Sequence, residues 1–597
     1  MDKIAVIDFG GQYAHLIANR IRRLGVYSEI ALPDASPDAM RGYRGIILSG
    51  SPHSVLEPGS PSIDPAILSL GIPILGLCYG HQLIAQALGG KVAKGSVREY
   101  GRADIRIVKD SPLFTGLDPV EQVWMSHGDT VETPAPAFEI LARTDDCPAA
   151  AVGDLARNLY GLQFHPEVTD TPHGMKILDN FLTICECTRG WNPKAFRETI
   201  IQSIRAQCGS RKVFLLVSGG VDSSVAFALL IEAIGPERVL GLHIDNGLMR
   251  YNESSDILGY LGRHGFDNLK IEDATGDFLD ALQGVVDPEE KRRVIGGKFI
   301  DVKDRVFAGL GLNPEEWLLA QGTIYPDTIE SAGTKHADRI KTHHNRVDAI
   351  LELIGRGLII EPLSQLYKDE VRELGEALGL PKHLVWRHPF PGPGLGVRVL
   401  CSDGGAVEPD KAASAQVADL ASAAGYSSVI LPVRSVGVQG DGRTYAHPAL
   451  LAGREDWPAI GELSTRITNN VRSVNRVVFS LTGTALFPYH LIPATITRQR
   501  LASLRAVDNI VTEALFASGE YDGVWQMPVV LLPLVNDRGG ECVVLRPIVS
   551  QEAMTARFIP LRHKTLSAIV DKAKTVPGIG DIFIDVTNKP PATIEWE

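Results

Sequence analysis

The chain alternates short apolar runs with longer amphipathic stretches, a pattern typical of sheets whose strands are covered by helices. Residues 3–8, 72–77, 213–217 and 239–244 are strand-length segments dominated by apolar side chains, and a polar or Gly-rich turn follows each of them. Helical patterns separate these segments, which predicts βαβ units. We therefore expect an α/β fold with doubly wound parallel sheets over the first two thirds of the chain.

The last third of the chain carries an internal repeat. Three segments recur in the same order, and each copy predicts helix, strand, loop, strand, helix and strand, so we expect a duplicated α+β module. The paired segments are 419–426 with 513–521, 431–443 with 527–538, and 475–483 with 580–588. The predicted boundaries are a first α/β domain over 1–188, a linker over 189–211, a second α/β domain over 212–398, and the two module copies over 399–500 and 501–597.

Composition narrows the class of protein. The length of 597 residues allows several cores, and the net charge of −12 argues against nonspecific nucleic-acid binding. No apolar run approaches the roughly 18 residues of a membrane helix, and the first residues enter a strand pattern without a signal-peptide pattern. Seven cysteines without framework spacing indicate reduced thiols. We therefore expect a cytoplasmic enzyme that acts on small molecules, away from membranes.

A Gly-rich loop joins one predicted strand to a predicted helix. Such a loop directs backbone N–H groups and the positive end of the helix dipole toward an anion. It lacks the Gly-Lys-Ser/Thr of a Walker A motif. It resembles the pyrophosphate loop of the N-type ATP pyrophosphatases, which cleave ATP between the α and β phosphates, and the alternative is an ordinary Gly/Ser turn. The loop reads Ser218-Gly219-Gly220-Val221-Asp222-Ser223-Ser224.

A second motif places a cysteine at a strand-to-helix turn. Cys78 lies between Gly76 and Gly80, which is the arrangement of a nucleophile elbow with a thiol in place of a serine hydroxyl. The start of a helix favours the reactive thiolate. Downstream, His165 and Glu167 are two residues apart, so on an extended strand they point to the same side. His165 can then take the thiol proton while Glu167 orients the imidazole.

These residues resemble the class I, triad-type glutamine amidotransferases. The resemblance implies that Cys78, His165 and Glu167 form a catalytic triad, in which Cys78 becomes a glutamyl thioester and ammonia is released. It also implies an oxyanion hole made by the backbone N–H groups of Ser51 and Tyr79. Ser51 stands where the family usually has glycine, and we expect strain there if the position needs a positive φ. The residues implied to bind glutamine are Gly50, Gln82, Ser126 and His127.

The remaining motifs resemble one family throughout. Segments 321–327, 341–345, 368–372 and 388–398 occur in the order found in the glutamine-hydrolysing GMP synthetases, and residues 589–597 resemble that family's C-terminus. The residues implied to bind ATP or pyrophosphate are the loop Ser218, Gly219, Gly220, Val221, Asp222, Ser223 and Ser224, together with Asp245, Lys341 and Lys368. Those implied to bind XMP are Arg292, Asp441, Arg443, Gln526, Lys589 and Glu595.

The resemblance implies a reaction in purine nucleotide biosynthesis. XMP is adenylated by ATP with release of pyrophosphate, and ammonia then displaces AMP to give GMP. Mg²⁺ accompanies ATP, with Asp222 as a ligand, and no organic prosthetic group is expected. Shorter bacterial members use a single C-terminal module to dimerise, so this chain with two copies is expected to be a monomer or a homodimer. Two alternatives stay open: another ATP-dependent amidation or thiolation enzyme with the same loop, and a non-catalytic nucleotide-binding paralogue.

Overall fold

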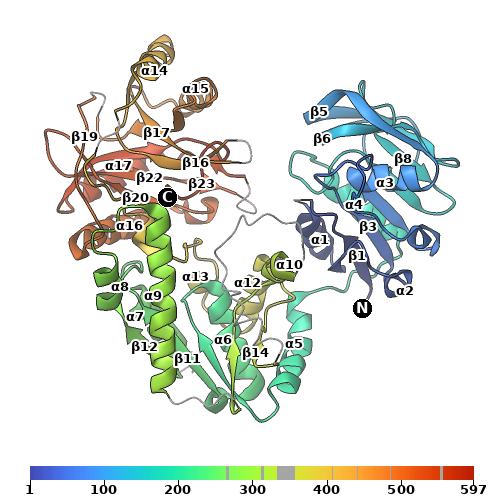
Figure 1. Ribbon diagram of the computed structural model, residues 1–597, viewed down its shortest axis with the longest axis horizontal. Helices are drawn as coiled ribbons and strands as arrows, with labels where there is room; N and C mark the ends of the chain where they lie inside the picture. Colours follow the sequence, from blue (N-terminus) through green and yellow to red (C-terminus); the bar gives the residue numbers. More distant parts are fainter. Residues whose placement is uncertain are drawn as a thin grey trace. The chain divides into compact units, whose positions relative to one another are not determined.

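The computed structural model describes residues 1–597 except 12, 264–267, 311–314, 333–355, 406–407, 440–441, 484–485 and 551–554. The chain folds into two compact units (Figure 1). The first unit comprises Met1–Ser203, Gly322–Arg356 and Glu361–Leu374, and the second comprises Ile204–Gln321, Gly357–Ile360 and Gly375–Glu597. None of the helices in the described part of the chain is both long enough and apolar enough to cross a membrane.

A nine-stranded sheet forms the centre of the first unit, in the order β2-β1-β3-β4-β9-β8-β7-β5-β6. Neighbours from β2 to β9 pair in parallel, as the α/β pattern predicts, and the other strands add antiparallel. The strands are β1 (Lys3–Ile7), β2 (Tyr27–Ala31), β3 (Gly45–Leu48), β4 (Ile74–Leu77), β5 (Lys91–Ile107), β6 (Val120–Thr133), β7 (Glu139–Arg143), β8 (Ala151–Asp154) and β9 (Leu159–Leu162). The helices are α1 (Ala14–Arg23), α2 (Pro37–Met40), α3 (Tyr79–Ala87), α4 (Gly174–Ile184) and α5 (Pro193–Cys208).

The segment 361–374 packs against α1 within the first unit. Arg22 forms a 2.9 Å ion pair with Glu370, and both side chains are buried. The indole N–H of Trp191 donates to the same carboxylate at 2.8 Å. These contacts explain why residues predicted in the second α/β domain group with the first unit. The helices of this part are α10 (Tyr325–Ala332) and α12 (Lys368–Ala377). The last residues of α12, from Gly375 onward, belong to the second unit.

A five-stranded parallel sheet opens the second unit, in the order β12-β11-β10-β13-β14. The central strand β10 leads into α6, so the predicted pyrophosphate loop lies at the carboxyl edge of the sheet, where open α/β sheets bind ligands. The strands are β10 (Lys212–Leu216), β11 (Val239–Asp245), β12 (Leu269–Asp273), β13 (Trp317–Ala320) and β14 (Ile359–Ile360). The helices are α6 (Val221–Ile234), α7 (Glu253–Arg263), α8 (Thr275–Ala281), α9 (Pro288–Gly309) and α13 (Lys382–Val385).

The rest of the second unit is built on one sheet with the path β15-β17-β18-β25-β22-β20, and β16 pairs with β17. Two small pairs, β19 with β21 and β23 with β24, lie beside it. The strands are β15 (Ser427–Ile430), β16 (Ser435–Gln439), β17 (Gly442–Ala452), β18 (Val474–Ser480), β19 (His490–Leu491), β20 (Val529–Leu532), β21 (Leu534–Val535), β22 (Glu541–Leu545), β23 (Ile548–Val549), β24 (Arg557–Phe558) and β25 (Ile579–Asp585). The helices are α14 (Lys411–Ala423), α15 (Trp457–Asn470), α16 (Arg498–Ser518) and α17 (His563–Ala573).

This sheet has matching halves about its middle. β15·β17 and β20·β22 are antiparallel, β17·β18 and β22·β25 are parallel, and β18 meets β25 antiparallel at the centre. The central register pairs Val478 with Asp585, Phe479 with Ile584, and Ser480 with Phe583. Exchanging the two halves about the Phe479–Ile584 pair reproduces the same register. The element order and the register therefore describe a local two-fold axis through the sheet.

One predicted echo is out of register with these strands. Ile430 pairs with Ala449 in the first half as Leu531 pairs with Val543 in the second. The strands thus equate Ile430 with Leu531, whereas the predicted echo begins by equating the next residue, Leu431, with Met527. The reason is that the connection from the outer strand to its partner is longer in the first half than in the second.

Candidate active sites

The elbow at Cys78 adopts a conformation that only small neighbours permit. Cys78 has a φ of 51° between β4 and α3, a left-handed value that is strained for a residue with a side chain. A Cβ on Gly76 would lie 2.5 Å from the carbonyl carbon of Gly80, and one on Gly80 would lie 2.4 Å from the carbonyl oxygen of Leu48. The two glycines flanking the cysteine are therefore required by close backbone packing.

The predicted triad is assembled and buried. His165 Nδ1 lies 2.7 Å from a carboxylate oxygen of Glu167, and His165 is in hydrogen-bond contact with Cys78. Burial alone would lower the pKa of His165, but Glu167 and Cys78 outweigh it and raise the pKa to about 10. The guanidinium of Arg20 donates to the backbone carbonyl of Glu167 at 3.1 Å and holds that end of the triad. An imidazolium here can stabilise a thiolate on Cys78.

The segment predicted to supply the oxyanion hole lies beside the triad. A Cβ on Gly50 would come 3.3 Å from the His165 ring and 4.0 Å from Cys78 Cβ. The backbone N–H of Gly80 donates to the Ser49 carbonyl at 3.1 Å and ties this segment to the elbow. Among the described residues, the non-glycine positions with positive φ do not include Ser51. The expected strain is therefore absent, and the Ser51 hydroxyl instead donates to the Phe9 carbonyl at 2.9 Å.

Of the residues predicted to bind glutamine, Ser126 contacts the sulfur directly, while Gln82 and His127 both contact the carbonyl of Asp129. Cys78 Sγ lies 3.5 Å from the Ser126 carbonyl, and the Gln82 side-chain amide donates to the Asp129 carbonyl at 2.8 Å. His127 is buried between two acceptors, the Asp129 carbonyl and a carboxylate oxygen of Glu99, each 3.0 Å from a ring nitrogen. Sequence reasoning missed Glu99, because 28 residues separate it from His127 and only the pairing of β5 with β6 brings them together.

One cluster in the described part of the first unit has donor atoms that suit a metal ion. Side-chain donor atoms of Glu99, His127 and Cys147 lie within 4.8 Å of one another. Those atoms are already engaged, since His127 pairs with Glu99 and the Thr130 hydroxyl lies 3.4 Å from Cys147 Sγ. Burial also raises the pKa of Cys147 to about 11, which disfavours the thiolate that a metal requires. The arrangement is therefore a hydrogen-bonded cluster.

The pyrophosphate loop of the second unit is preorganised by its own hydroxyl groups. Ser218 Oγ accepts the backbone N–H of Gly220 at 3.1 Å, and Ser223 Oγ donates to the Gly220 carbonyl at 3.2 Å. Gly219 has a φ of 77°, and a Cβ there would lie 2.2 Å from Cδ1 of Ile257. The loop leads directly into α6, whose N-terminus favours an anion.

Two charged side chains that sequence reasoning missed hold this loop. The guanidinium of Arg387 donates to the Gly219 carbonyl and, at 2.8 Å, to Glu253 at the start of α7. Asp245 ends β11, and its carboxylate accepts the backbone N–H of Gly247 at 2.9 Å, as an aspartate does in a turn. No motif marked Arg387, because 168 residues separate it from Gly219.

Two lysines outside this loop are also predicted to bind ATP. Lys341 lies outside the described residues. Lys368 begins α12 in the first unit, whereas the loop belongs to the second. The donor set at the loop nevertheless suits Mg²⁺ with ATP, since the carboxylate of Asp222 in the first turn of α6 is a hard oxygen ligand.

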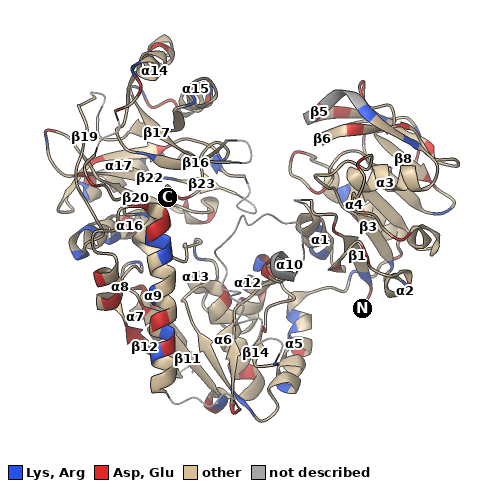
Figure 2. Cartoon of the chain, in the orientation of Figure 1, with Lys and Arg blue, Asp and Glu red and all other residues tan. Residues whose placement is uncertain are grey.

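Of the residues predicted to bind XMP, Gln526 contacts Glu595, and Arg398, which the sequence did not mark, holds the same carboxylate. Arg398 donates to both carboxylate oxygens of Glu595, at 3.0 and 2.8 Å, and the Gln526 amide donates to one of them at 3.1 Å. Arg292 lies on α9, whose acidic and basic residues are interspersed (Figure 2), and it donates to the backbone of Glu597. Asp441 lies outside the described residues, and only the backbone of Arg443 is described, in β17. Lys589 pairs by its backbone N–H with Ala556 at 2.7 Å.

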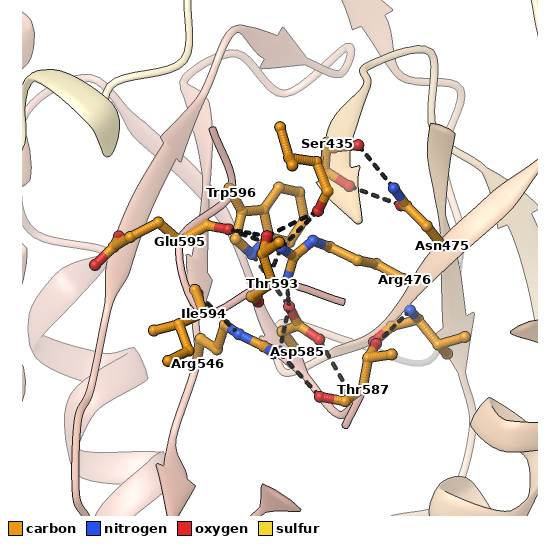
Figure 3. A network of polar contacts seen from close by, with 12 residues as sticks. Ser435, Asn475, Arg476, Arg546, Asp585, Thr587, Thr593, Ile594, Glu595 and Trp596 are labelled. Atoms are coloured by element: carbon orange, nitrogen blue, oxygen red, sulfur yellow. Dashed lines mark hydrogen bonds and ion pairs between the residues drawn. The ribbon is translucent and has the colours of Figure 1, made fainter. Parts of the chain in front are cut away.

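A buried ionic network anchors this C-terminal tail to both halves of the sheet (Figure 3). Asp585 forms ion pairs with Arg476 of the first half at 2.9 Å and with Arg546 of the second at 2.8 Å. Arg476 also donates to the backbone carbonyls of Thr593 and Glu595 at 3.0 and 2.8 Å. The tail is thus docked from end to end, and Glu595 is held at a defined place.

Comparison with known proteins agrees with this geometry. Residues 5–185 match the family model for class-I glutamine amidotransferases, residues 195–275 match that for NAD synthase, and residues 415–486 and 513–596 match that for the GMP synthase C terminal domain. An elbow with its triad in one unit and a pyrophosphate loop in the other define the class: a glutamine amidotransferase joined to an ATP-binding domain.

Full-length relatives narrow the class to one family. A probable glutamine-hydrolysing GMP synthase of Leptospira interrogans is 44% identical over 603 residues, covering 100% of this chain and 99% of its own. A probable glutamine-hydrolysing GMP synthase of Caenorhabditis elegans is 36% identical and covers 100% of this chain and 92% of its own. The enzyme of that name from Heliobacterium modesticaldum is 45% identical over 510 residues, 81% of this chain and 97% of its own. The chain belongs to the glutamine-hydrolysing GMP synthase family.

Proposed function

We propose that this chain makes GMP from XMP, ATP and glutamine. Cys78 attacks the side-chain carbonyl of glutamine and forms a thioester, and the amide nitrogen leaves as ammonia. The O2 of XMP attacks the α-phosphate of ATP and releases pyrophosphate, and ammonia then displaces AMP at C2. The observation that carries the proposal is the assembled Cys78–His165–Glu167 triad in a chain of this family that also has the pyrophosphate loop.

Each site contributes a defined physical task. His165 receives the thiol proton, because its Nδ1 is held by Glu167 and its pKa is raised to about 10. The N-terminus of α6 and the hydroxyls of Ser218 and Ser223 bind the leaving pyrophosphate. Asp222 would hold Mg²⁺, which supplies charge neutralisation at the phosphates when bound. Lys341 and Lys368 are proposed to act on the phosphates.

The XMP site is proposed to lie around the docked tail. Glu595 would accept the purine N–H, with Arg398 and Gln526 orienting its carboxylate. Lys589 would bind the phosphate, and the segment with Asp441 and Arg443 would approach from the first half of the sheet. A carboxylate held at both oxygens by a buried guanidinium has a fixed orientation, so it can recognise a donor edge of the base.

We further propose that the two halves of the C-terminal sheet are copies of one module and that the chain works as a monomer. The local two-fold register about Phe479 and Ile584 supports the duplication. The tail follows β25 of the second half yet pairs with β16 of the first, through the Gly437–Ala592 bridge. One chain can thus complete a site that single-module relatives complete by dimerising. Light scattering that finds an obligate dimer, with or without XMP, would contradict this.

The decisive experiment compares nitrogen sources in wild type and Cys78→Ala. GMP formation from XMP, ATP and Mg²⁺ is measured with glutamine and with ammonium. We expect Cys78→Ala to lose glutamine-dependent activity and to keep ammonium-dependent activity. Cys187→Ala, which removes a partly buried thiol outside the triad, is the matched control and should keep both. No GMP with either source in wild type would overturn the proposal and direct the search to other acceptors.

We also propose that the enzyme is cytoplasmic. All seven cysteines are free, as expected of a protein in a reducing compartment.

A further inference from the structure

The side chain of Gln163 lies directly against the sulfur of Cys78. Its amide nitrogen is 3.7 Å from Cys78 Sγ, within hydrogen-bond distance for sulfur. Gln163 follows β9, is fully buried, and donates its backbone N–H to the Ala150 carbonyl at 2.9 Å. Gln163 is not one of the site residues predicted from the sequence, and the proposed function assigns it no role. A buried polar group aimed at a reacting atom is a candidate for function.

The neighbouring groups determine which end of the Gln163 amide faces the sulfur. The Asp129 carbonyl can only accept, so the group of Gln82 that lies 2.8 Å from it is the NH₂. The same NH₂ group lies 3.2 Å from the Gln163 side chain, which must therefore present its oxygen there. The Gln163 NH₂ group then faces Cys78. The Asp129 carbonyl thus determines which group donates in each of the hydrogen bonds that link Gln82, Gln163 and Cys78.

We propose that Gln163 stabilises the thiolate of Cys78 by donating an amide N–H to the sulfur, with Gln82 and the Asp129 carbonyl as the positioning groups. The inference rests on the proposed glutaminase function and deepens it. When Cys78 gives its proton to His165, the charge left on the sulfur faces the Gln163 donor. Hydrogen bonds to charged acceptors are stronger than those to neutral ones, so this contact favours the thiolate over the thiol.

The contact of the sulfur with Ser126 does not supply this effect. The Ser126 carbonyl, 3.5 Å from Sγ, can accept the thiol proton but offers nothing to a thiolate. Ser126 therefore favours the neutral form, while Gln163 and the His165 imidazolium favour the charged one. Removing the Gln163 donor should shift the balance toward the thiol.

The test uses Gln163→Met in the full chain, because methionine has a similar volume and no donor. The probe is iodoacetamide, and the rate of Cys78 alkylation is followed by mass spectrometry across neutral and alkaline pH. We expect a rate near neutral pH that is lower by roughly tenfold, and a pH profile displaced upward by about one unit. The maximum glutamine turnover rate should fall more than KM for glutamine rises. Gln122→Met, which removes an amide donor to the Asp170 carbonyl elsewhere in the first unit, is the matched control.

Two further variants separate a chemical role from a packing role. Gln163→Asn keeps an amide donor, and Gln163→Glu places a negative charge beside the sulfur. Stabilisation of the thiolate predicts alkylation rates in the order wild type, Asn, Met, Glu. Filling of space predicts that Met is tolerated best and Asn worst, because only Asn leaves a cavity. The denaturant midpoint of the first unit in each sample reports folding. If Gln163→Met does not fold, the order of Asn and Glu decides.

The outcomes distinguish this inference from the proposed function. If Gln163→Met has the alkylation profile and glutamine-dependent rate of wild type, the inference is overturned while Cys78 stands as nucleophile. If complete alkylation of wild-type Cys78 leaves glutamine-dependent activity intact, the proposed nucleophile itself is wrong.

Discussion

Replacing Asp585 by asparagine removes the shared acceptor of two buried arginines. Asp585, Arg476 and Arg546 have side chains with 0% exposure. Burial alone would raise the pKa of Asp585, but the guanidinium groups of Arg546 and Arg476 outweigh it and lower that pKa. Asparagine keeps the shape of the side chain and removes its charge. Its NH₂ group also takes the place of an acceptor oxygen, because Oδ1 accepts from Thr587 and Oδ2 from Arg476, so the change tests the charge and the acceptor together.

The magnitude follows from burial. Removing one partner of a buried ion pair costs about 3–5 kcal/mol, because an uncompensated charge stays in the interior. Burial and the neighbouring Arg546 already lower the pKa of Arg476 to about 9. Removing the negative charge of Asp585 would therefore destabilise this site further. Both arginines also donate to tail carbonyls, Arg546 to that of Ile594 at 3.0 Å. If half of the cost loosens the tail that carries Glu595, apparent affinity for XMP falls by at least roughly tenfold.

The assay is release of pyrophosphate with ammonium as nitrogen source, so that glutamine hydrolysis does not enter. We expect Asp585→Asn to raise KM for XMP by at least about tenfold and to lower the denaturant midpoint of the second unit. Asp571→Asn, the same change at an exposed position on α17, should alter neither. A KM for XMP within twofold of wild type, together with an unchanged midpoint, would refute the reasoning.

Further predictions concern the triad and the two loops. Since the pKa of His165 rises from 6.5 to about 10, the imidazolium contributes stability fully below pH 6.5, and this is lost as pH rises through about 10. Glu167→Gln should therefore move the alkaline limit of glutamine-dependent activity to lower pH, and an unmoved limit contradicts the assignment. Gly219→Ala should reduce GMP formation at least about a hundredfold with either nitrogen source, because its Cβ would lie 2.2 Å from Ile257. Gly220→Ala is the control and should have a smaller effect, because the atom nearest to its Cβ would be 3.1 Å away. Ser51→Gly should change glutamine-dependent kcat/KM by less than about twofold, because no positive φ is relieved; a large gain would show hidden strain.

The sequence predicted the elbow and the anion loop because all the residues that shape each of them lie within one short segment. The elbow at Cys78 and the loop at 218–224 each form within one strand, one turn and one helix, and the glycines they need lie in the same short segment. His165 and Glu167 are likewise two residues apart, although they lie in the bend and turn that follow β9 and not on the extended strand that we expected. The parallel order of the first strands followed from alternating patterns. The sequence did not predict the correct alignment of the outer strands of the two halves, because the length of a loop between paired strands leaves no periodic pattern of apolar residues.

The chemistry-bearing types of residue and their local conformations were determined by the sequence itself: a cysteine on an elbow, a serine- and glycine-rich anion loop, and a charged C-terminal tail. Tertiary structure decided which distant groups complete each site. Gln163 reaches Cys78 across 85 residues, and Arg398 reaches Glu595 across 197. The physical reason is that sheet pairing joins strands irrespective of their separation along the chain, and only that pairing buries these polar groups beside the partners that make their burial favourable.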